Sequence, residues 1–248
     1  PLKGNFRKGF AYSDCWVDDA RLVVLNALSA AERGAEVLVR TRLASAEAVD
    51  GQWRARLVPI AGPERTVRAR AIVNAAGPWA GRVAADILGL PAAASLRLVK
   101  GSHIVVPRLF GHDMAYVFQQ PDRRILFAIP YQDRFTLIGT TEVDFDGDPA
   151  GARIDNGEIA YLCQAAGRYF RAPVDPAAVV WSYSGVRPLY GTDSGTASAV
   201  SREYRLEVAK GAGGAPALSV FGGKITTYRR LAERALDRLR PFVGLKAP

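Results

Sequence analysis

The order of apolar and polar positions predicts a chain in which helices and strands alternate. Residues 18–33 (DDARLVVLNALSAAER) are rich in Ala and Leu, begin with acidic residues and run into Gly34. These are start and stop signals of a helix, and the apolar face is broad enough for burial. Residues 36–43 predict a strand, and residues 52–60 alternate Trp53, Ala55 and Leu57 with polar positions, as a half-buried strand does.

The middle of the chain has the pattern of an antiparallel sheet. Between residues 97 and 139, the β-rich segments SHIVVP, AYVFQQ, RILFAIP and FTLIGT are separated by turn residues that include Pro121-Asp122, which is typical of strands joined by short turns. A helix is expected near 154–170, followed by strands at 179–186, 204–209 and 217–223. An amphipathic helix over 225–239 ends the pattern.

These elements predict a mixed fold, α/β plus α+β, in two domains. A helix, a strand and a short meander over residues 1–96 indicate the later part of a nucleotide-binding α/β domain. Residues 97–200 predict an antiparallel-sheet domain that binds substrate. The strands and helix of residues 201–248 are expected to return and complete the first domain.

The composition excludes several classes of protein but does not identify a binding partner. The 248 residues are 49% hydrophobic, which excludes a disordered or collagen-like chain, and no run of 18 apolar residues exists to span a membrane. Two Cys and two His stand at no zinc-binding spacing, so no metal site is expected and a reducing cytoplasm fits best. The net charge of +9 attracts phosphates of nucleic acid, lipid or a small substrate alike.

Four short stretches concentrate residues that could carry chemistry. The strand that ends in NAAGPW (74–79) brings small residues where backbone can approach a cofactor, although a buried strand with a Gly-Pro turn looks the same. His103, at the start of a β-branched run, is the natural general base, or else a structural histidine. Arg187, between Gly-Val and Pro, could bind a phosphate or polarise an oxygen, or else be solvated.

The fourth stretch, FGGKITTYR (221–229), is the most specific. An apolar strand, a Gly-Gly turn, a Lys and two Thr precede a helix, which suits an anion or the edge of a flavin. The spacings GxxxxGK[ST] and GxGxxG are absent from the chain, so these residues alone do not make a complete dinucleotide site.

In this order, six motifs resemble those of the FAD-dependent glycerol-3-phosphate dehydrogenases, the respiratory flavoenzymes of aerobic glycerol use. The motifs are YSDCWVDDAR (12–21), NAAGPW, KGSHIVVPR (100–108), IGTTEVDFDGDP (138–149), YSGVRPL (183–189) and FGGKITTYR. The resemblance runs from about Phe10 to the final helix, nearly the whole chain.

The resemblance implies a two-domain flavoenzyme, part FAD-binding Rossmann-like domain and part antiparallel substrate domain. Such an enzyme oxidises sn-glycerol 3-phosphate to dihydroxyacetone phosphate and passes electrons to a quinone, from the cytoplasm and in peripheral contact with the inner face of the cytoplasmic membrane. It places His103 and Arg187 near the flavin ring and the substrate hydroxyl, and Lys224 and Arg202 at the phosphate. The implied FAD contacts are Gly77, Pro78, Gly223, Thr226 and Thr227. A homodimer is left open.

The chain starts at Pro1 and is expected to be a piece of a longer protein. It lacks the N-terminal Gly-rich βαβ unit and the C-terminal helical region of the family, so by itself it is expected to bind FAD weakly and to be inactive. Two alternatives remain at this point. One is a related FAD-dependent amino-acid oxidase, which needs an Arg for a carboxylate but no cations for a phosphate. The other is a basic nucleic-acid-binding module. The Lys and Arg residues are scattered along the chain and no RNA-binding signature is present, and both observations argue against this alternative.

Overall fold

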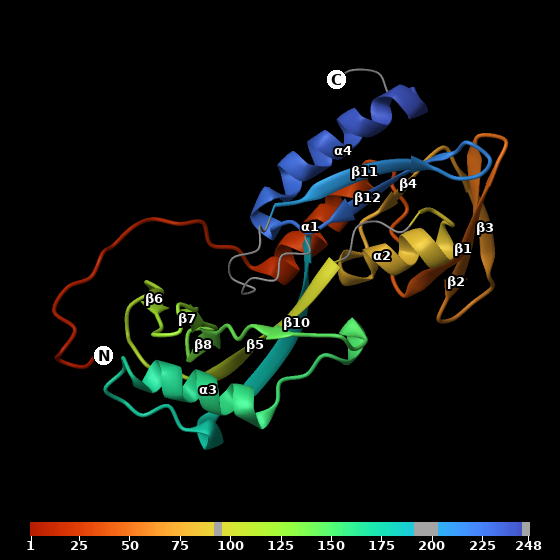
Figure 1. Ribbon diagram of the computed structural model, residues 1–248. Helices are drawn as coiled ribbons and strands as arrows, with labels where there is room; N and C mark the ends of the chain where they lie inside the picture. Colours follow the sequence, from red (N-terminus) through yellow and green to blue (C-terminus); the bar gives the residue numbers. More distant parts are fainter. Residues whose placement is uncertain (92–95, 191–202, 245–248) are drawn as a thin grey trace. The chain divides into compact units, whose positions relative to one another are not determined.

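The computed structural model describes residues 1–91, 96–190 and 203–244, shown in Figure 1. The chain divides into two compact units, and each is built from two separate stretches. Unit 1 comprises Pro1–Ala11 and Arg97–Ser201, and unit 2 comprises Tyr12–Leu96 and Arg202–Pro248. Residues 1–11, predicted to lie in the nucleotide-binding domain, instead join unit 1 because Leu2 bridges to Phe170 and Lys3 N donates to Tyr169 O.

Unit 1 is a sheet with a helix on one face. The strands follow the order β10-β5-β8-β7-β6, with β9 pairing with β5. Their bounds are β5 (Leu96–Pro107), β6 (Tyr116–Gln119), β7 (Ile125–Tyr131), β8 (Phe135–Gly139), β9 (Val143–Asp144) and β10 (Trp181–Tyr190). Helix α3 (Asn156–Gly167) begins with a capping box between Asp155 and Glu158, which satisfies free N–H groups of its first turn.

The core of unit 1 lies between the sheet and α3. Side chains from β5, β7 and β8 meet those of the helix, among them Ile104, Leu126, Ile138 and Leu162, all of which are at most 1% exposed. Since alternate residues of a strand point to opposite faces, odd-numbered residues of β5 such as Gly101 and His103 lie on the face away from α3.

Unit 2 contains two three-stranded sheets. One has the order β1-β2-β3, and the other has the order β11-β12-β4 with β12 parallel to β4. Trp53, 1% exposed, anchors the first sheet by donating from Nε1 to Pro216 O of the second. The bounds are β1 (Thr41–Val49), β2 (Gln52–Pro59), β3 (Arg65–Ala69), β4 (Ile72–Asn74), β11 (Arg205–Lys210) and β12 (Pro216–Phe221).

Three helices accompany these sheets, namely α1 (Asp19–Glu32), α2 (Ala80–Arg82) and α4 (Tyr228–Val243). Helix α4 packs Ala235, Leu239 and Val243 against Leu218 and Val220 of β12. Short single-turn segments lie at Gly77–Trp79, Val83–Ile87, Pro149–Gly151, Pro176–Ala178 and Ile225–Thr227.

Two sequence predictions are wrong in detail. Helix α1 forms where predicted but buries none of its residues, and Val23, Val24 and Leu28 are 55–61% exposed. An apolar face shows that a helix can be buried, whereas burial also needs a partner surface. Residues 36–40, predicted to begin a strand, are outside any described strand, and β1 starts only at Thr41, because β1 finds its ladder partner in β2 from Thr41 onward.

The predicted fold class is confirmed, with the antiparallel sheet in the second region and mixed α/β structure in the first. Among residues 1–91, 96–190 and 203–244, no helix has the length and apolar character needed to cross a membrane. Within the same ranges, no three His, Cys, Asp or Glu side chains gather into a metal-binding group.

Candidate active site

His103 lies on the face of the unit 1 sheet away from α3, close against a glycine of the next strand. In the β5–β8 ladder His103 stands opposite Gly139, and a Cβ atom at Gly139 would lie 2.0 Å from Cδ2 of His103. Any larger residue at this position would therefore displace the ring. Tyr183 of β10 stacks on the ring, with centroids 4.9 Å apart and planes 6° from parallel.

Arg187 occupies the same face in the same manner. A Cβ atom at Gly101 would lie 2.6 Å from Nη2 of Arg187, so the guanidinium also lies against bare backbone. Its Nη2 donates to Oγ1 of Thr140 at 3.0 Å. Gly139 and Gly101 thus give the two candidate side chains, His103 and Arg187, room to lie close to the sheet.

The electrostatics of this face keep His103 neutral. Burial, followed by the positive charge of Arg187, lowers the pKa of His103 from its ordinary value of 6.5 to about 4. The Nδ1 atom of His103 is buried and has no hydrogen-bond partner among the described residues. A neutral imidazole beside a guanidinium can accept a proton from a group whose oxygen the guanidinium stabilises.

In unit 2, the carboxyl ends of the parallel strands β4 and β12 form a second candidate site. Asn74, 3% exposed, ends β4, pairs with Ser219 in the ladder and donates from Nδ2 to Ala80 O at 2.8 Å and Ser219 Oγ at 3.2 Å. These bonds fix the turn in which Gly77 takes a φ of 57°. Pro78 follows at the first turn of the segment Gly77–Trp79.

The turn after β12 contributes two more glycines in the left-handed region. Gly222 has a φ of 71° and Gly223 a φ of 107°. Lys224 and Thr226 after them are exposed, and the half-buried Thr227 donates from Oγ1 to Lys224 O at 2.9 Å. Backbone with little side-chain bulk therefore surrounds the ends of both parallel strands, where open α/β sheets bind ligands.

The sequence-predicted site residues thus fall into two groups. His103 and Arg187 lie near each other in unit 1, and their shared catalytic role stays a prediction. Gly77, Pro78, Gly223, Lys224, Thr226 and Thr227 lie in unit 2, in the turns that follow β4 and β12. Arg202 lies outside the described residues.

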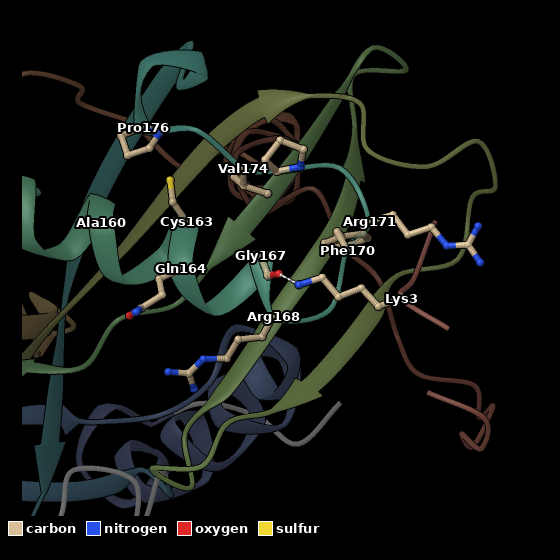
Figure 2. Close-up of a pocket in the computed structure, with 11 residues that line it drawn as sticks. Lys3, Ala160, Cys163, Gln164, Gly167, Arg168, Phe170, Arg171, Val174 and Pro176 are labelled. Carbon is tan, nitrogen blue, oxygen red and sulfur yellow. Dashed lines mark hydrogen bonds between the residues drawn. The ribbon is translucent and has the colours of Figure 1, made fainter. Parts of the chain in front are cut away.

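A separate cavity of about 630 Å³ lies against α3 in unit 1. Figure 2 shows its lining, which includes Cys163 on the helix and the cations Lys3, Arg168 and Arg171. Lys3 Nζ donates to Gly167 O and Arg171 Nε donates to Leu2 O, so both cations already hold the N-terminal segment in place. None of the predicted site residues lines this cavity.

The comparison with family models identifies the class of protein. The model of the DAO family, described as FAD dependent oxidoreductase, matches residues 1–229. The chain belongs to this FAD-dependent oxidoreductase family.

Individual members show strong similarity over the whole of this chain. It is 51% identical to a glycerol-3-phosphate dehydrogenase of Pseudomonas aeruginosa over 100% of the chain, and 46% identical to a D-erythritol 1-phosphate dehydrogenase of Brucella abortus over 97%. In both cases the match covers 48% of the relative, so the chain spans about half the length of the curated relatives that it matches.

The fold of this chain is also similar to that of a solved glycerol-3-phosphate dehydrogenase. The glycerol-3-phosphate dehydrogenase from Bacillus halodurans, complexed with FAD, superposes with a TM-score of 0.77 at 29% identity. The superposition covers 93% of this chain and 44% of that chain.

Sequence reasoning missed the groups that support His103 and Arg187. Tyr183, Thr140, Gly101 and Gly139 all stand within the quoted motifs, yet none was assigned a role. The alternation Tyr183–Gly185–Arg187 along one strand could have pointed to Tyr183, since these positions share a face. Gly139 under His103 depends on the register between two strands, which the sequence does not specify.

Proposed function

We propose that the protein to which this chain belongs oxidises sn-glycerol 3-phosphate to dihydroxyacetone phosphate with FAD as cofactor. The observation that carries the proposal is the pair of His103 and Arg187 on one face of the unit 1 sheet, each packed closely against a glycine. This pair supplies a proton acceptor beside a cation, in a chain of the FAD-dependent oxidoreductase family.

The residues of unit 2 fit a flavin cofactor. Gly77 takes a left-handed φ and nothing lies within 4 Å of the position of an added Cβ, whereas a Cβ at Gly223 would lie 3.4 Å from Cβ of Tyr204. Backbone bare of side chains at the ends of two parallel strands lets a flat ring and a phosphate approach closely. When bound, FAD supplies the acceptor for the hydride that leaves the alcohol carbon.

The side chains of this chain prepare the substrate for the loss of the hydride from its alcohol carbon. His103, neutral at neutral pH, removes the proton of the C2 hydroxyl. Arg187 stabilises the negative charge that grows on the same oxygen, and its fork geometry holds that oxygen in one direction. Lys224 and Arg202 bind the phosphate, whose double negative charge calls for several cations.

The test uses the full-length, FAD-loaded enzyme under anaerobic conditions. Addition of sn-glycerol 3-phosphate is expected to bleach the flavin absorbance, while glycerol without phosphate at the same concentration leaves it oxidised. Bleaching by amino acids instead of phosphates would overturn the proposal in favour of an amino-acid oxidase. Failure of all three to bleach the flavin would overturn both assignments.

A second candidate substrate is D-erythritol 1-phosphate, which the 46% identity to the Brucella abortus enzyme favours. It carries the same alcohol and phosphate chemistry on a chain one carbon longer. The two substrates are separated by kcat/KM in the same assay, and the larger value identifies the physiological class of polyol phosphate.

The proposal extends to the electron acceptor and the location of the enzyme. We propose a quinone as the acceptor, reached from the cytoplasm by peripheral contact with the inner face of the cytoplasmic membrane. The net charge of +9 supports contact with an anionic lipid surface. Flotation of the full-length protein with vesicles containing phosphatidylglycerol, compared with neutral vesicles, tests this contact.

A further inference from the structure

A buried carboxylate lies beneath the His103–Arg187 face, on the side of the sheet that α3 covers. Glu158 of α3 is 6% exposed. Its Oε1 accepts from Oγ of Ser102 at 2.9 Å and from Oγ1 of Thr141 at 2.7 Å. Its Oε2 accepts from Nζ of Lys100 at 2.8 Å and from the backbone N of Asp155 at 3.1 Å.

Helix capping explains only one of these four bonds. The bond to Asp155 N belongs to the capping box. The remaining three reach Lys100 and Ser102 of β5 and Thr141, which lies between β8 and β9. Lys100, 7% exposed, also donates from Nζ to Arg153 O at 2.8 Å. A buried ion pair seldom adds stability over apolar residues of the same volume, so the presence of the Lys100–Glu158 pair calls for another reason.

The hydroxyl partners of Glu158 are the immediate neighbours of the site residues. Ser102 precedes His103, and Thr141 follows Thr140, which holds Arg187. Ser102 N donates to Oγ1 of Thr141 at 2.9 Å, so the two strand segments are tied to each other and to the carboxylate. Because neighbouring side chains in a strand point to opposite faces, fixing Ser102 from below fixes the direction of His103 above.

The same network reaches β10. Ser102 Oγ lies 2.8 Å from Ser184 Oγ. The Ser102 proton is directed to Glu158, so Ser184 is the donor of this bond. Ser184 adjoins Tyr183, whose ring stacks on His103. Strand β5, which carries His103, and strand β10, which carries Tyr183 and Arg187, are therefore linked to one carboxylate through Ser102.

We infer that Glu158 is a positioning residue, which acts through Ser102 and Thr141 to hold His103 and Arg187 in their working geometry. The inference rests on the proposed function, since it assigns those two residues to the reaction. Lys100 keeps the carboxylate charged and in place. Lys100 does not need to touch the substrate for this role.

The test compares Thr141→Val with Thr141→Ser in the full-length holoenzyme. Val has nearly the shape of Thr but can make neither the bond to Glu158 nor the bond to Ser102 N, whereas Ser retains both. Both variants keep Glu158 as the partner of Lys100. Thr141→Val is expected to lower kcat/KM for glycerol 3-phosphate roughly tenfold, since small misplacements of reacting groups are costly. Thr141→Ser should restore it to within about twofold. Gln164→Ala, at an exposed position of α3, serves as the control and should equal wild type.

A crystal structure of the Thr141→Val holoenzyme supplies a measurement that does not depend on turnover. Displacement of the Arg187 guanidinium or the His103 ring from its glycine is expected. The inference is overturned if both side chains stay in place, or if Thr141→Val and Thr141→Ser lose activity equally. Wild-type enzyme that fails to be reduced by glycerol 3-phosphate would overturn the proposed function instead, and the crystal structure would still decide whether the network positions the two side chains.

Discussion

The two units present their candidate functional groups in opposite ways. In unit 1 the proposed chemistry is carried by side chains, His103 and Arg187, each lying against a glycine and contacted by a neighbouring ring or hydroxyl. In unit 2 it is carried by backbone, through turns with left-handed glycines at the ends of β4 and β12. A reacting group must be held in one direction, whereas a large cofactor needs a surface free of side chains, and the two designs follow from these needs.

The largest expected effect of breaking this arrangement is that of Arg187→Ala in the full-length enzyme. Removing a charge that stabilises the developing oxyanion costs on the order of 3–4 kcal/mol, a hundredfold or more in kcat/KM. FAD content should stay at the wild-type level because the proposed cofactor residues lie in unit 2. Arg134→Ala, at an exposed turn of unit 1, is the control, and near-normal kinetics of Arg187→Ala would refute the assignment.

The stability of unit 1 is expected to depend on pH, because the pKa of its His103 is lowered from 6.5 to about 4. Above pH 6.5 neither the folded nor the unfolded chain protonates His103, so stability is at its full value. Between pH 6.5 and 4 only the unfolded chain takes up the proton, and about 3 kcal/mol of unfolding free energy is lost. Urea unfolding at pH 7, 5.5 and 4 measures this loss.

His103→Asn is the matched variant for that measurement. It keeps a hydrogen-bonding side chain and removes the titratable group, so its stability should fall less steeply in this pH range. In the full-length enzyme it should also reduce FAD poorly at every pH and lack the acid limb of kcat/KM, expected near pH 4 in wild type. An acid limb that survives the substitution unchanged would show that another group is the base.

Gly139→Ala adds a single methyl group and tests whether His103 needs the space that Gly139 leaves. The new Cβ would lie 2.0 Å from His103, so the ring must move, and kcat/KM is expected to fall about a hundredfold while FAD stays bound. Gly151→Ala, where nothing lies within 4 Å of the new Cβ, should leave kinetics unchanged. If both variants behave alike, the close approach of His103 to Gly139 has no functional role.

The smallest effect is expected in unit 2, from Gly223→Ala. Its φ of 107° strains any L-residue by about 1–2 kcal/mol, so the Kd for FAD should rise up to about tenfold while His103 and Arg187 keep their geometry. Gly81→Ala, with open space and an ordinary φ, is the control in the same unit. An unchanged Kd for FAD in Gly223→Ala would show that this turn does not contact the cofactor.

The sequence predicted the elements better than their contacts. The alternation of Trp53 and Ala55 marked the buried face of β2 correctly, with both at most 5% exposed, because period-two patterns report directly on burial. The apolar face of α1 predicted burial that the structure does not show, since a pattern reveals what a helix can cover but not which surface covers it. His103 and Arg187 could be singled out as residue types in motifs. Their supports could not, because strand register brings Gly139 to His103 and Gly101 to Arg187, and tertiary packing brings Glu158 to Ser102 and Thr141.

The pairing of β4 with β12 has a consequence for the order of folding. Asn74 and Ser219 are 145 positions apart, and residues of unit 1 fill most of the interval between them. Closing so long a loop is slow, whereas the meander β6–β7–β8 joins neighbours along the chain. During synthesis the described strands of unit 1 leave the ribosome before β12 does, so unit 1 can fold before β4 pairs with β12. The edge formed by β4 and β12 is therefore expected to assemble after unit 1.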